Sequence, residues 1–410
     1  MIEVYDSKAE CCGCGVCAQV CPKSAIEMET DECGFLFPVI SQELCIDCGL
    51  CQRKCPFKKN HVNTIKQCYA AVSSDDRLLT GSASGGMFSA FANLFLNKGG
   101  CVCGATLEID RGVASIKHIV IESLEELPKL QGSKYVQSYM QEVFDKVLGP
   151  LMQGRKVLFS GTPCQVAAMK TLVGNRFRKS LYTIDIICHG VPSQKMFNDY
   201  IQTESKRRKI IIQDFKFRDK AYGWGLNGSI YGINIEGNVV KAVIHPDCSS
   251  YYHFFLNGEI YRDCCYQCPF AQKKRTGDLS IGDYWGAEKY SPELMDENGG
   301  PFSKQTGVSC LMINTEAGAE LLDDMDGLIL KKPVDFSKIA IVNTQLSHPA
   351  AHTSLRMRLM TLYTQKGYQG IEYNFQVWRR KAEMKRCAKR TIKQILPIKA
   401  VSAIKKFLKV

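Results

Sequence analysis

The sequence contains no run of 18 or more apolar residues, the length that a membrane-spanning helix requires, so no membrane span is expected. Its first residues, MIEVYDSKAECC, lack the charged segment followed by an apolar segment that marks a secretory signal. The sequence is therefore predicted to work in the cytoplasm. In that reducing compartment 21 cysteines indicate metal binding or redox chemistry rather than a disulfide framework.

Excess charge is missing from most of the chain. The net charge is +12, but residues 379–410 contain twelve Lys or Arg and a single acid, Glu383, and so carry +11 of it. The nearly neutral remainder argues against nucleic-acid binding. In the tail, basic residues alternate with Ile, Leu, Val and Phe, as in a helix that lies on a membrane surface, and Pro397 is expected to divide it. Peripheral contact with the inner face of the membrane is one interpretation; a solvated helix or a docking surface for an acidic ferredoxin is the other.

Cysteine is abundant, and its spacing is regular. CCGCGVCAQVCP, residues 11–22, is repeated 34 residues later as CIDCGLCQRKCP. Three cysteines at two-residue intervals, followed by a fourth before proline, are typical of ferredoxins with two 4Fe–4S clusters, in which the fourth cysteine of each run ligates the other cluster. Zinc, with four ligands from two separated pairs, fits this pattern poorly. The predicted ligands are Cys11, Cys14, Cys17 and Cys55 for one cluster and Cys45, Cys48, Cys51 and Cys21 for the other, with Cys12, Cys33 and Cys68 left without a role.

Strand-like and helix-like segments alternate between about residues 68 and 330, which predicts the α/β (α+β) fold class. Short turns around Asn227–Gly228 and Glu236–Gly237 favour a mixed sheet. The predicted strands are CYAAVSS, CVCGATL, KVLFSG, LYTIDIIC, IIIQDFKF, DLSIGDYW and VSCLMINT, and the predicted helices are GMFSAFANLFLN, QVAAMKTLV and QKMFNDYIQTES. The predicted domains are a two-cluster ferredoxin-like domain at 1–60, an α/β domain at 61–350 and a helical, basic tail at 351–410.

A second group of cysteines lies at apparent strand ends or in loops: Cys164, Cys188, Cys264, Cys265 and Cys268. An α/β sheet places ligands and catalytic groups at such strand ends. Small buried cysteines are also common in protein cores. Spacing alone therefore leaves a third metal site and a structural role equally open.

Seven motifs occur in order: TGSASGGMFSAF, LQGSKYVQSYM, VLFSGTPCQVAAM, DIICHGVPS, FRDKAYGWG, RDCCYQCPF and GDLSIGDYWG. Together they resemble the coenzyme F-420 hydrogenase/dehydrogenase beta-subunit family over roughly residues 1–350. Relatives in that family include beta subunits of hydrogenases and formate dehydrogenases and certain chlorophyll-pathway reductases. The resemblance implies that FAD binds beside a further 4Fe–4S cluster in the 61–350 domain.

The resemblance also implies site residues. The third cluster falls on Cys164, Cys188, Cys265 and Cys268, with Cys264 as a competing neighbour of Cys265. The FAD site falls on Ser84, Gly85 and Gly86, where a helix start can hold a pyrophosphate, on Gln131, Gly132, Ser133, Lys134 and Tyr135, and on the turn Gly161, Thr162 and Pro163.

Two of these motifs supply candidate catalytic residues. Lys134 is expected to neutralise phosphate or donate a proton near the flavin, and the alternative is a surface lysine. His189 is a candidate proton donor or a structural histidine. Arg218 with Asp219 is interpreted as a candidate site pair or a structural ion pair, and Asp283 and Trp285 are expected to pack near the third cluster.

The combined prediction is a ferredoxin-linked, flavin-dependent oxidoreductase. A ferredoxin or another redox partner protein would supply single electrons, three 4Fe–4S clusters would relay them to FAD, and hydride would pass to or from a small molecule such as coenzyme F-420. The alternative is an electron-transfer subunit of a larger complex with no substrate site of its own. The sequence selects neither a substrate nor an oligomeric state.

Overall fold

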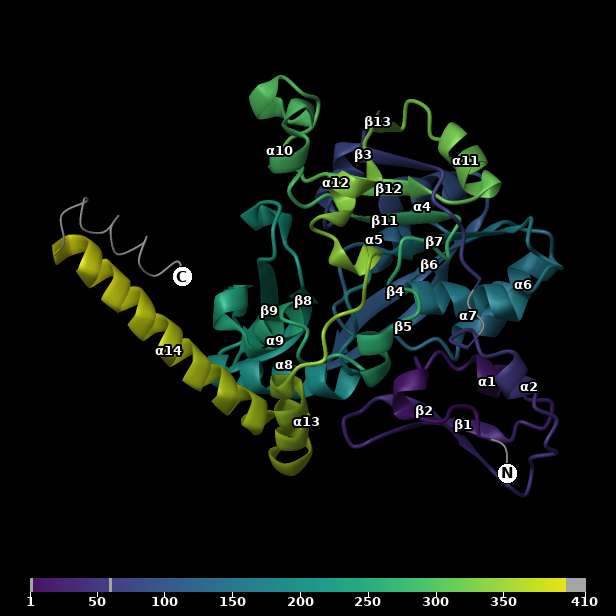
Figure 1. The fold of residues 1–410 in the computed structure, drawn as a ribbon, viewed down its shortest axis with the longest axis horizontal. Coiled ribbons are helices and arrows are strands. Elements are labelled where there is room, and N and C mark those ends of the chain that lie inside the picture. Colours follow the sequence, from purple (N-terminus) through teal and green to yellow (C-terminus); the bar gives the residue numbers. More distant parts are fainter. Residues whose placement is uncertain (1–2, 59–60, 396–410) are drawn as a thin grey trace.

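The computed structural model describes residues 3–58 and 61–395, and Figure 1 shows a small N-terminal module beside a larger α/β body. In the module an antiparallel hairpin, β1 (Ile26–Thr30) and β2 (Leu36–Ile40), lies against two short helices, α1 (Val16–Gln19) and α2 (Leu50–Arg53). Each helix follows a glycine in the left-handed region, Gly15 with φ 81° and Gly49 with φ 66°. The sequence repeat is therefore also a structural repeat. Glycine occupies both positions because it adopts the left-handed conformation without steric cost.

An eight-stranded mixed sheet forms the centre of the body, in the order β13-β3-β12-β11-β7-β6-β4-β5. Strands β4, β6, β7 and β11 are parallel, and the remaining pairs are antiparallel. The predicted mixed α/β architecture is confirmed. The bounds are β3 Gln67–Ser73, β4 Cys101–Asp110, β5 Val113–Ile121, β6 Val157–Gly161, β7 Leu181–Ile186, β11 Leu279–Asp283, β12 Ser309–Ile313 and β13 Ile329–Pro333.

Helices cover both faces of this sheet. Helices α4 (Met87–Asn97) and α11 (Glu316–Asp323) share an apolar cluster with one set of alternate strand residues, among them Val102 and Leu158. Helices α6 (Val143–Met152) and α7 (Pro163–Val173) pack with the intervening residues on the other face. The two-sided burial explains why the central strands are nearly continuous apolar runs.

A second, three-stranded antiparallel sheet stands beside the first, made of β8 (Ile210–Lys216), β9 (Gly228–Asn234) and β10 (Val239–Ile244). The turn at Glu236–Gly237 joins β9 to β10 as predicted. The predicted short turn at Asn227–Gly228 is wrong, because residues 217–227 form a long connection from β8 to β9. The Gly-x-Gly-x-x-Gly run at 223–228 lies here before a strand, whereas the dinucleotide-binding turn leads from a strand into a helix.

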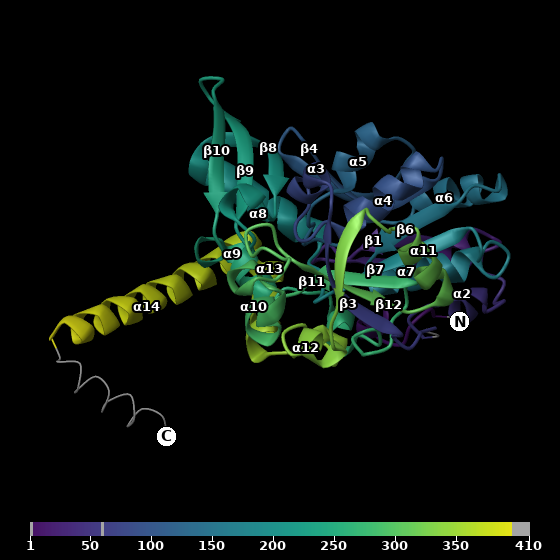
Figure 2. The same ribbon diagram turned by 90° about the horizontal axis from the view of Figure 1, so that it is seen from above.

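The C-terminal helices are partly core and partly projecting. Helix α13 (Ser354–Lys366) and the first turns of α14 (Tyr368–Ile395) bury Leu359, Ile371 and Phe375 against α8 (Gln194–Arg208) and α9 (Ser250–Leu256). Beyond these turns α14 projects from the body (Figures 1 and 2). Pro397 and the last basic residues lie outside the described residues. Within the described part, no helix has the length and apolarity needed to cross a membrane.

The remaining helical elements are short. They are α3 Asp76–Thr80, α5 Leu127–Leu130, α10 Ala287–Tyr290, α12 Phe336–Ala340, η1 Lys8–Glu10, η2 Leu124–Glu126, η3 Lys220–Tyr222, η4 Pro246–Cys248, η5 Asp263–Gln267, η6 Pro292–Leu294, η7 Asp296–Asn298 and η8 Thr344–Leu346.

Candidate functional site

Two small cavities in the N-terminal module gather the cysteines of the two repeats. One, of about 20 Å³, is lined by Cys11, Cys14, Cys17 and Cys55, with Cys12 beside them. The other, also of about 20 Å³, is lined by Cys21, Cys45, Cys48 and Cys51. Each cavity therefore takes three cysteines from one repeat and the fourth from the other, which is the grouping expected from the spacing.

Backbone groups support these sulfurs. The N–H of Gly13 donates to Cys11 Sγ at 3.4 Å, and the N–H of Ala25 donates to Cys21 Sγ at 3.3 Å. Such donors favour thiolate over thiol and are a usual means of tuning cluster ligands. No group of three or more His, Cys, Asp or Glu among residues 3–58 and 61–395 is arranged around a single metal ion.

A third group of cysteines meets where the module touches the body. Cys164 lies in the first turn of α7, Cys188 follows β7, and Cys265 and Cys268 lie in and just after η5. The pKa of Cys188 is raised well above its usual value, mainly by burial and next by the negative charges of Cys265, Cys164 and Cys268. Burial is the main cause that raises the pKa of Cys268 to about 12, and the negative charges of Cys164 and Cys265 contribute next. These mutual effects place the four predicted residues in one cluster of thiols.

The structure also distinguishes the two neighbouring cysteines of η5. Cys265 is among the strongest electrostatic neighbours of Cys164, Cys188 and Cys268. Cys264 is buried and has Cys265, Arg262 and Cys12 as its main neighbours instead. Cys265 is thus the member of the pair whose charge acts on the pKa values of all three other thiols.

Cys12, which sequence reasoning leaves without a role, lies at the junction of two cysteine groups. Its thiol is a hydrogen-bonding neighbour of both Cys14 and Cys164. No sequence signal marks this position, because its spacing fits neither Cys-x-x-Cys run. The contact joins a wall of the first cavity of the module to the third cysteine group.

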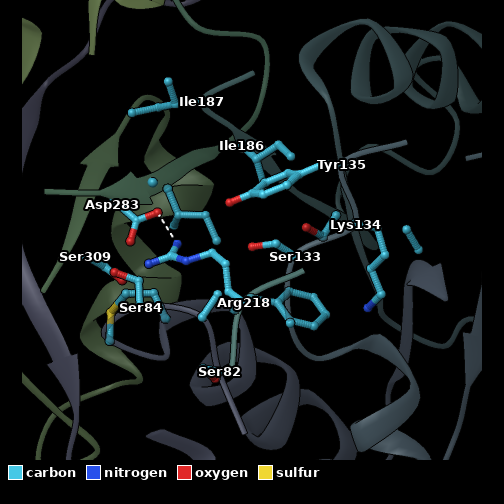
Figure 3. Close-up of a pocket in the computed structure, with 18 of the residues that line it drawn as sticks. Ser82, Ser84, Ser133, Lys134, Tyr135, Ile186, Ile187, Arg218, Asp283 and Ser309 are labelled. Atoms are coloured by element: carbon cyan, nitrogen blue, oxygen red, sulfur yellow. Dashed lines mark hydrogen bonds and ion pairs between the residues drawn. The ribbon is translucent and has the colours of Figure 1, made fainter. Parts of the chain in front are cut away.

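A cavity of about 420 Å³ opens at the carboxyl ends of the parallel strands, and Figure 3 shows residues that line it. Its lining includes His189, the residue after Cys188. The ends of β6, β7 and β11 reach it, which is where an α/β sheet normally binds ligands, and its size is ordinary for a ligand site. Of the residues predicted for FAD or catalysis, those lining it are Ser84, Gly86, Gly132, Ser133, Lys134, Tyr135, Gly161 and His189.

Four predicted residues lie behind the cavity wall. A Cβ on Gly85 would come within 2.3 Å of the Ala71 carbonyl oxygen, so only glycine fits between strands there. Gln131 Nε2 donates to Ser89 Oγ at 3.0 Å. Thr162 caps α7, with its Oγ1 at 3.1 Å from Cys164 Sγ, and Pro163 is the first residue of that helix. These residues shape the wall rather than face the cavity.

The two candidate catalytic residues differ in their surroundings. Lys134 Nζ donates to the carbonyl oxygens of Gln131 at 2.7 Å and Leu130 at 2.9 Å, and its amine points away from Arg218 in Figure 3. Desolvation lowers the pKa of Lys134 to about 7. His189 lies on the cavity wall next to Cys188, where desolvation lowers its pKa against the opposing effect of Asp283.

A cluster of Arg218, Asp283 and two tryptophans lies on the opposite wall, and the sequence did not predict how its members pair. Arg218 Nη1 donates to Asp283 Oδ2 at 2.6 Å, and Trp224 Nε1 donates to the other oxygen of Asp283 at 2.8 Å. The guanidinium lies 5.0 Å from the Trp285 ring centre, and the two tryptophans stack. Arg218 pairs with Asp283 and not with its neighbour Asp219, which binds Ser229 and Lys241.

One nitrogen of this buried arginine has no acceptor at bonding distance in the described part of the chain, and the Tyr135 hydroxyl is a further hydrogen-bonding neighbour of the guanidinium. Arg218 Nη2 has no hydrogen-bond partner at bonding distance among the described residues, although its side chain is only 3% exposed. Figure 3 shows the Tyr135 hydroxyl directed toward the same region. Because a buried donor without an acceptor is costly, the geometry leaves room for an acceptor atom from a bound molecule.

Comparisons with known proteins agree with these features. Residues 154–335 match the family model that describes the C terminus of the coenzyme F420 hydrogenase/dehydrogenase beta subunit. Residues 10–59 match the 4Fe-4S dicluster domain. Over residues 154–335 the chain is thus similar to the coenzyme F420 hydrogenase/dehydrogenase beta subunit, and the predicted resemblance is confirmed. With its 4Fe-4S dicluster domain, the protein is an iron–sulfur electron-transfer subunit related to that beta subunit.

The structural comparison found a chain in a structure of the F420-reducing [NiFe] hydrogenase complex from Methanosarcina barkeri. The two chains are 17% identical, with a TM-score of 0.44, and the match covers 78% of this chain and 93% of that chain. No curated protein matches the sequence.

Proposed function

We propose that this protein is an iron–sulfur flavoprotein oxidoreductase that relays single electrons through three 4Fe–4S clusters to FAD. The observation that carries the proposal is the shared wall between the third cysteine group and the 420 Å³ cavity. Gly161 and His189 line the cavity, and Cys164 and Cys188 lie three residues and one residue away along the chain. An organic cofactor in the cavity would thus adjoin a metal cluster.

The third group would hold its cluster through Cys164, Cys188, Cys265 and Cys268. These four thiols come from three separate segments that the fold brings together, and the cavity-facing segment 186–189 includes one of them. Sulfur-only ligation by four cysteines suits a 4Fe–4S cluster.

The cavity residues suit a dinucleotide cofactor. Gly86 caps the 11-residue helix α4, and Ser84, Gly86 and Met87 line the cavity, so the helix start offers N–H groups to a pyrophosphate. When bound, FAD supplies the exchange between one-electron and hydride chemistry. Arg218 Nη2 would donate to a carbonyl oxygen of the bound molecule, and we assign the holding or moving of a proton to His189 and Lys134, whose pKa values burial lowers.

Purified chain should show this activity alone. We expect anaerobically purified protein, given dithionite or reduced ferredoxin as the one-electron donor, to reduce a hydride acceptor such as coenzyme F-420, with two electrons and one proton consumed per hydride. Absorbance of the acceptor measures the reaction. Activity that appears only after a second polypeptide is added would favour the alternative, an electron-transfer subunit without its own substrate site.

We further propose that the basic tail makes peripheral contact with anionic membranes. The projecting part of α14 exposes Met384 next to Arg and Lys side chains, which suits an interfacial helix. Full-length protein should float with vesicles of anionic lipid, and a chain ending at residue 378 should not. Equal flotation of the two proteins would contradict membrane contact, and flotation with neutral vesicles as well would contradict the electrostatic part.

A further inference from the structure

Arg262 is a fully buried cation without an acidic partner. Its side chain is 0% exposed, and no Asp or Glu of the described residues lies within ion-pair distance of it. Arg275 is buried to a similar degree, but it is paired with Asp185 at 2.5 Å. Removing a guanidinium from water is expensive unless an opposite charge compensates it. Arg262 therefore lacks the counter-charge that its burial requires.

Neutral groups fix the position of this side chain. Arg262 Nε donates to the carbonyl oxygen of Cys11 at 2.6 Å, and Nη2 donates to that of Leu36 at 2.7 Å. Nη1 approaches Gln137 Oε1 at 3.5 Å, and the guanidinium lies 4.1 Å from the Phe37 ring centre. These contacts satisfy the donors and tie the N-terminal module to the body, but they add no negative charge.

Two cysteine groups flank the guanidinium. It bonds to Cys11 of the first group, and a Cβ on Gly13 would come within 2.9 Å of Nη1. Cys265 of the third group is three residues along the chain, and its backbone N–H donates to the backbone carbonyl oxygen of Arg262 at 3.0 Å. The thiols of Cys264, Cys11, Cys12 and Cys265 are the groups whose charge most favours the Arg262 cation.

We propose that Arg262 is the shared counter-charge of two anionic iron–sulfur clusters, the Cys11 cluster of the module and the third cluster of the body. A 4Fe–4S cluster with four thiolates is an anion that gains one more negative charge on reduction. A fixed cation between the two stabilises each reduced state, raises both reduction potentials and lessens the repulsion between the clusters. Arg262 is thus a positioning and tuning residue for electron passage from module to body.

The effect of Arg262 on the third cluster rests on the proposed function. Its effect on the Cys11 cluster rests on the dicluster domain alone. Anaerobic redox titration of the full chain, followed by electron paramagnetic resonance, measures each cluster. In Arg262→Gln, the midpoint potentials of the Cys11 cluster and the third cluster should both shift to more negative values. The Cys45 cluster should keep its potential. In Arg262→Lys the two affected potentials should stay close to those of the unmodified protein, because lysine keeps the positive charge.

A second variant leaves the arginine in place. Gln137→Glu puts a carboxylate beside Arg262 Nη1 and keeps the size of the side chain, while it removes the hydrogen bond from Gln137 Nε2 to the Cys12 carbonyl oxygen. It should shift the same two potentials in the same direction, and it tests the proposal even if the Arg262→Gln protein does not retain its clusters. Unchanged potentials in Gln137→Glu, or an equal shift of all three clusters, would overturn the proposal. A shift confined to the Cys11 cluster would retain Arg262 as its counter-charge and count against the third cluster itself.

Discussion

Replacing Cys265 by Ser should remove about four of about twelve iron atoms per chain and leave the two clusters of the N-terminal module intact. A serine hydroxyl is a poor substitute for thiolate, and the charge of Cys265 acts on the pKa values of Cys164, Cys188 and Cys268. The predicted ligands of the module are a separate set of cysteines, so the spectrum of its clusters should not change. Iron analysis together with electron paramagnetic resonance of the reduced protein measures the loss.

The adjacent cysteine provides a matched control. Cys264→Ser changes the same atom one position away in a buried side chain that faces Arg262 and Cys12. It should keep all of the iron. Loss of iron from Cys264→Ser but not from Cys265→Ser would show that Cys264 is the cluster ligand and Cys265 is not. A full complement of iron in both variants would contradict the third cluster.

Gly104→Leu should deprive the protein of most of its flavin without affecting its iron. Gly104 is a strand residue of β4 on the cavity wall, where an added Cβ would meet Leu130 Cδ1 at 3.4 Å and Phe88 Cζ at 3.5 Å. Further side-chain atoms must enter the space proposed for FAD. If the clash costs the FAD complex as much as overpacking costs a protein core, roughly 1–3 kcal/mol, FAD binds about 5- to 150-fold more weakly. Flavin absorbance after gel filtration, compared with iron content, gives the result.

Gly149→Leu is the control for this substitution. Gly149 lies in α6, where an added Cβ meets nothing within 4 Å, so the same side chain is placed far from the cavity. This variant should retain both flavin and iron. A full complement of flavin in Gly104→Leu would show that FAD does not occupy the cavity, whatever the control does.

Patterns among residues that are close in the sequence were sufficient to predict most of the strands and the two cysteine sets of the module. The strand-like runs became β3, β4, β6, β7, β8, β11 and β12, because each is a short apolar segment that the sheet or its neighbours bury. Likewise, the two cysteine runs of the module have a fixed spacing, and the cavities at Cys11 and Cys21 gather the sets which that spacing indicates. In both cases residues close in sequence determine the geometry.

The features that escaped prediction depend on contacts between distant segments. Arg218 and Asp283 are 65 residues apart, and their pairing follows from the long connection between β8 and β9, where a short turn was expected. Cys12 and Cys164 meet only because the module docks on α7. Nothing in the sequence distinguishes Arg262 from the other residues of the RDCCYQC motif. Neighbours along the chain cannot show that its side chain is buried and has no acidic partner among the described residues.

The cofactor content of the unmodified protein, purified without oxygen, tests the proposed function most directly. We expect about twelve iron atoms per chain, from three four-iron clusters, together with one non-covalent FAD. Iron near eight atoms with a full complement of FAD would contradict the third cluster, and twelve iron atoms without flavin would contradict the proposed use of the cavity.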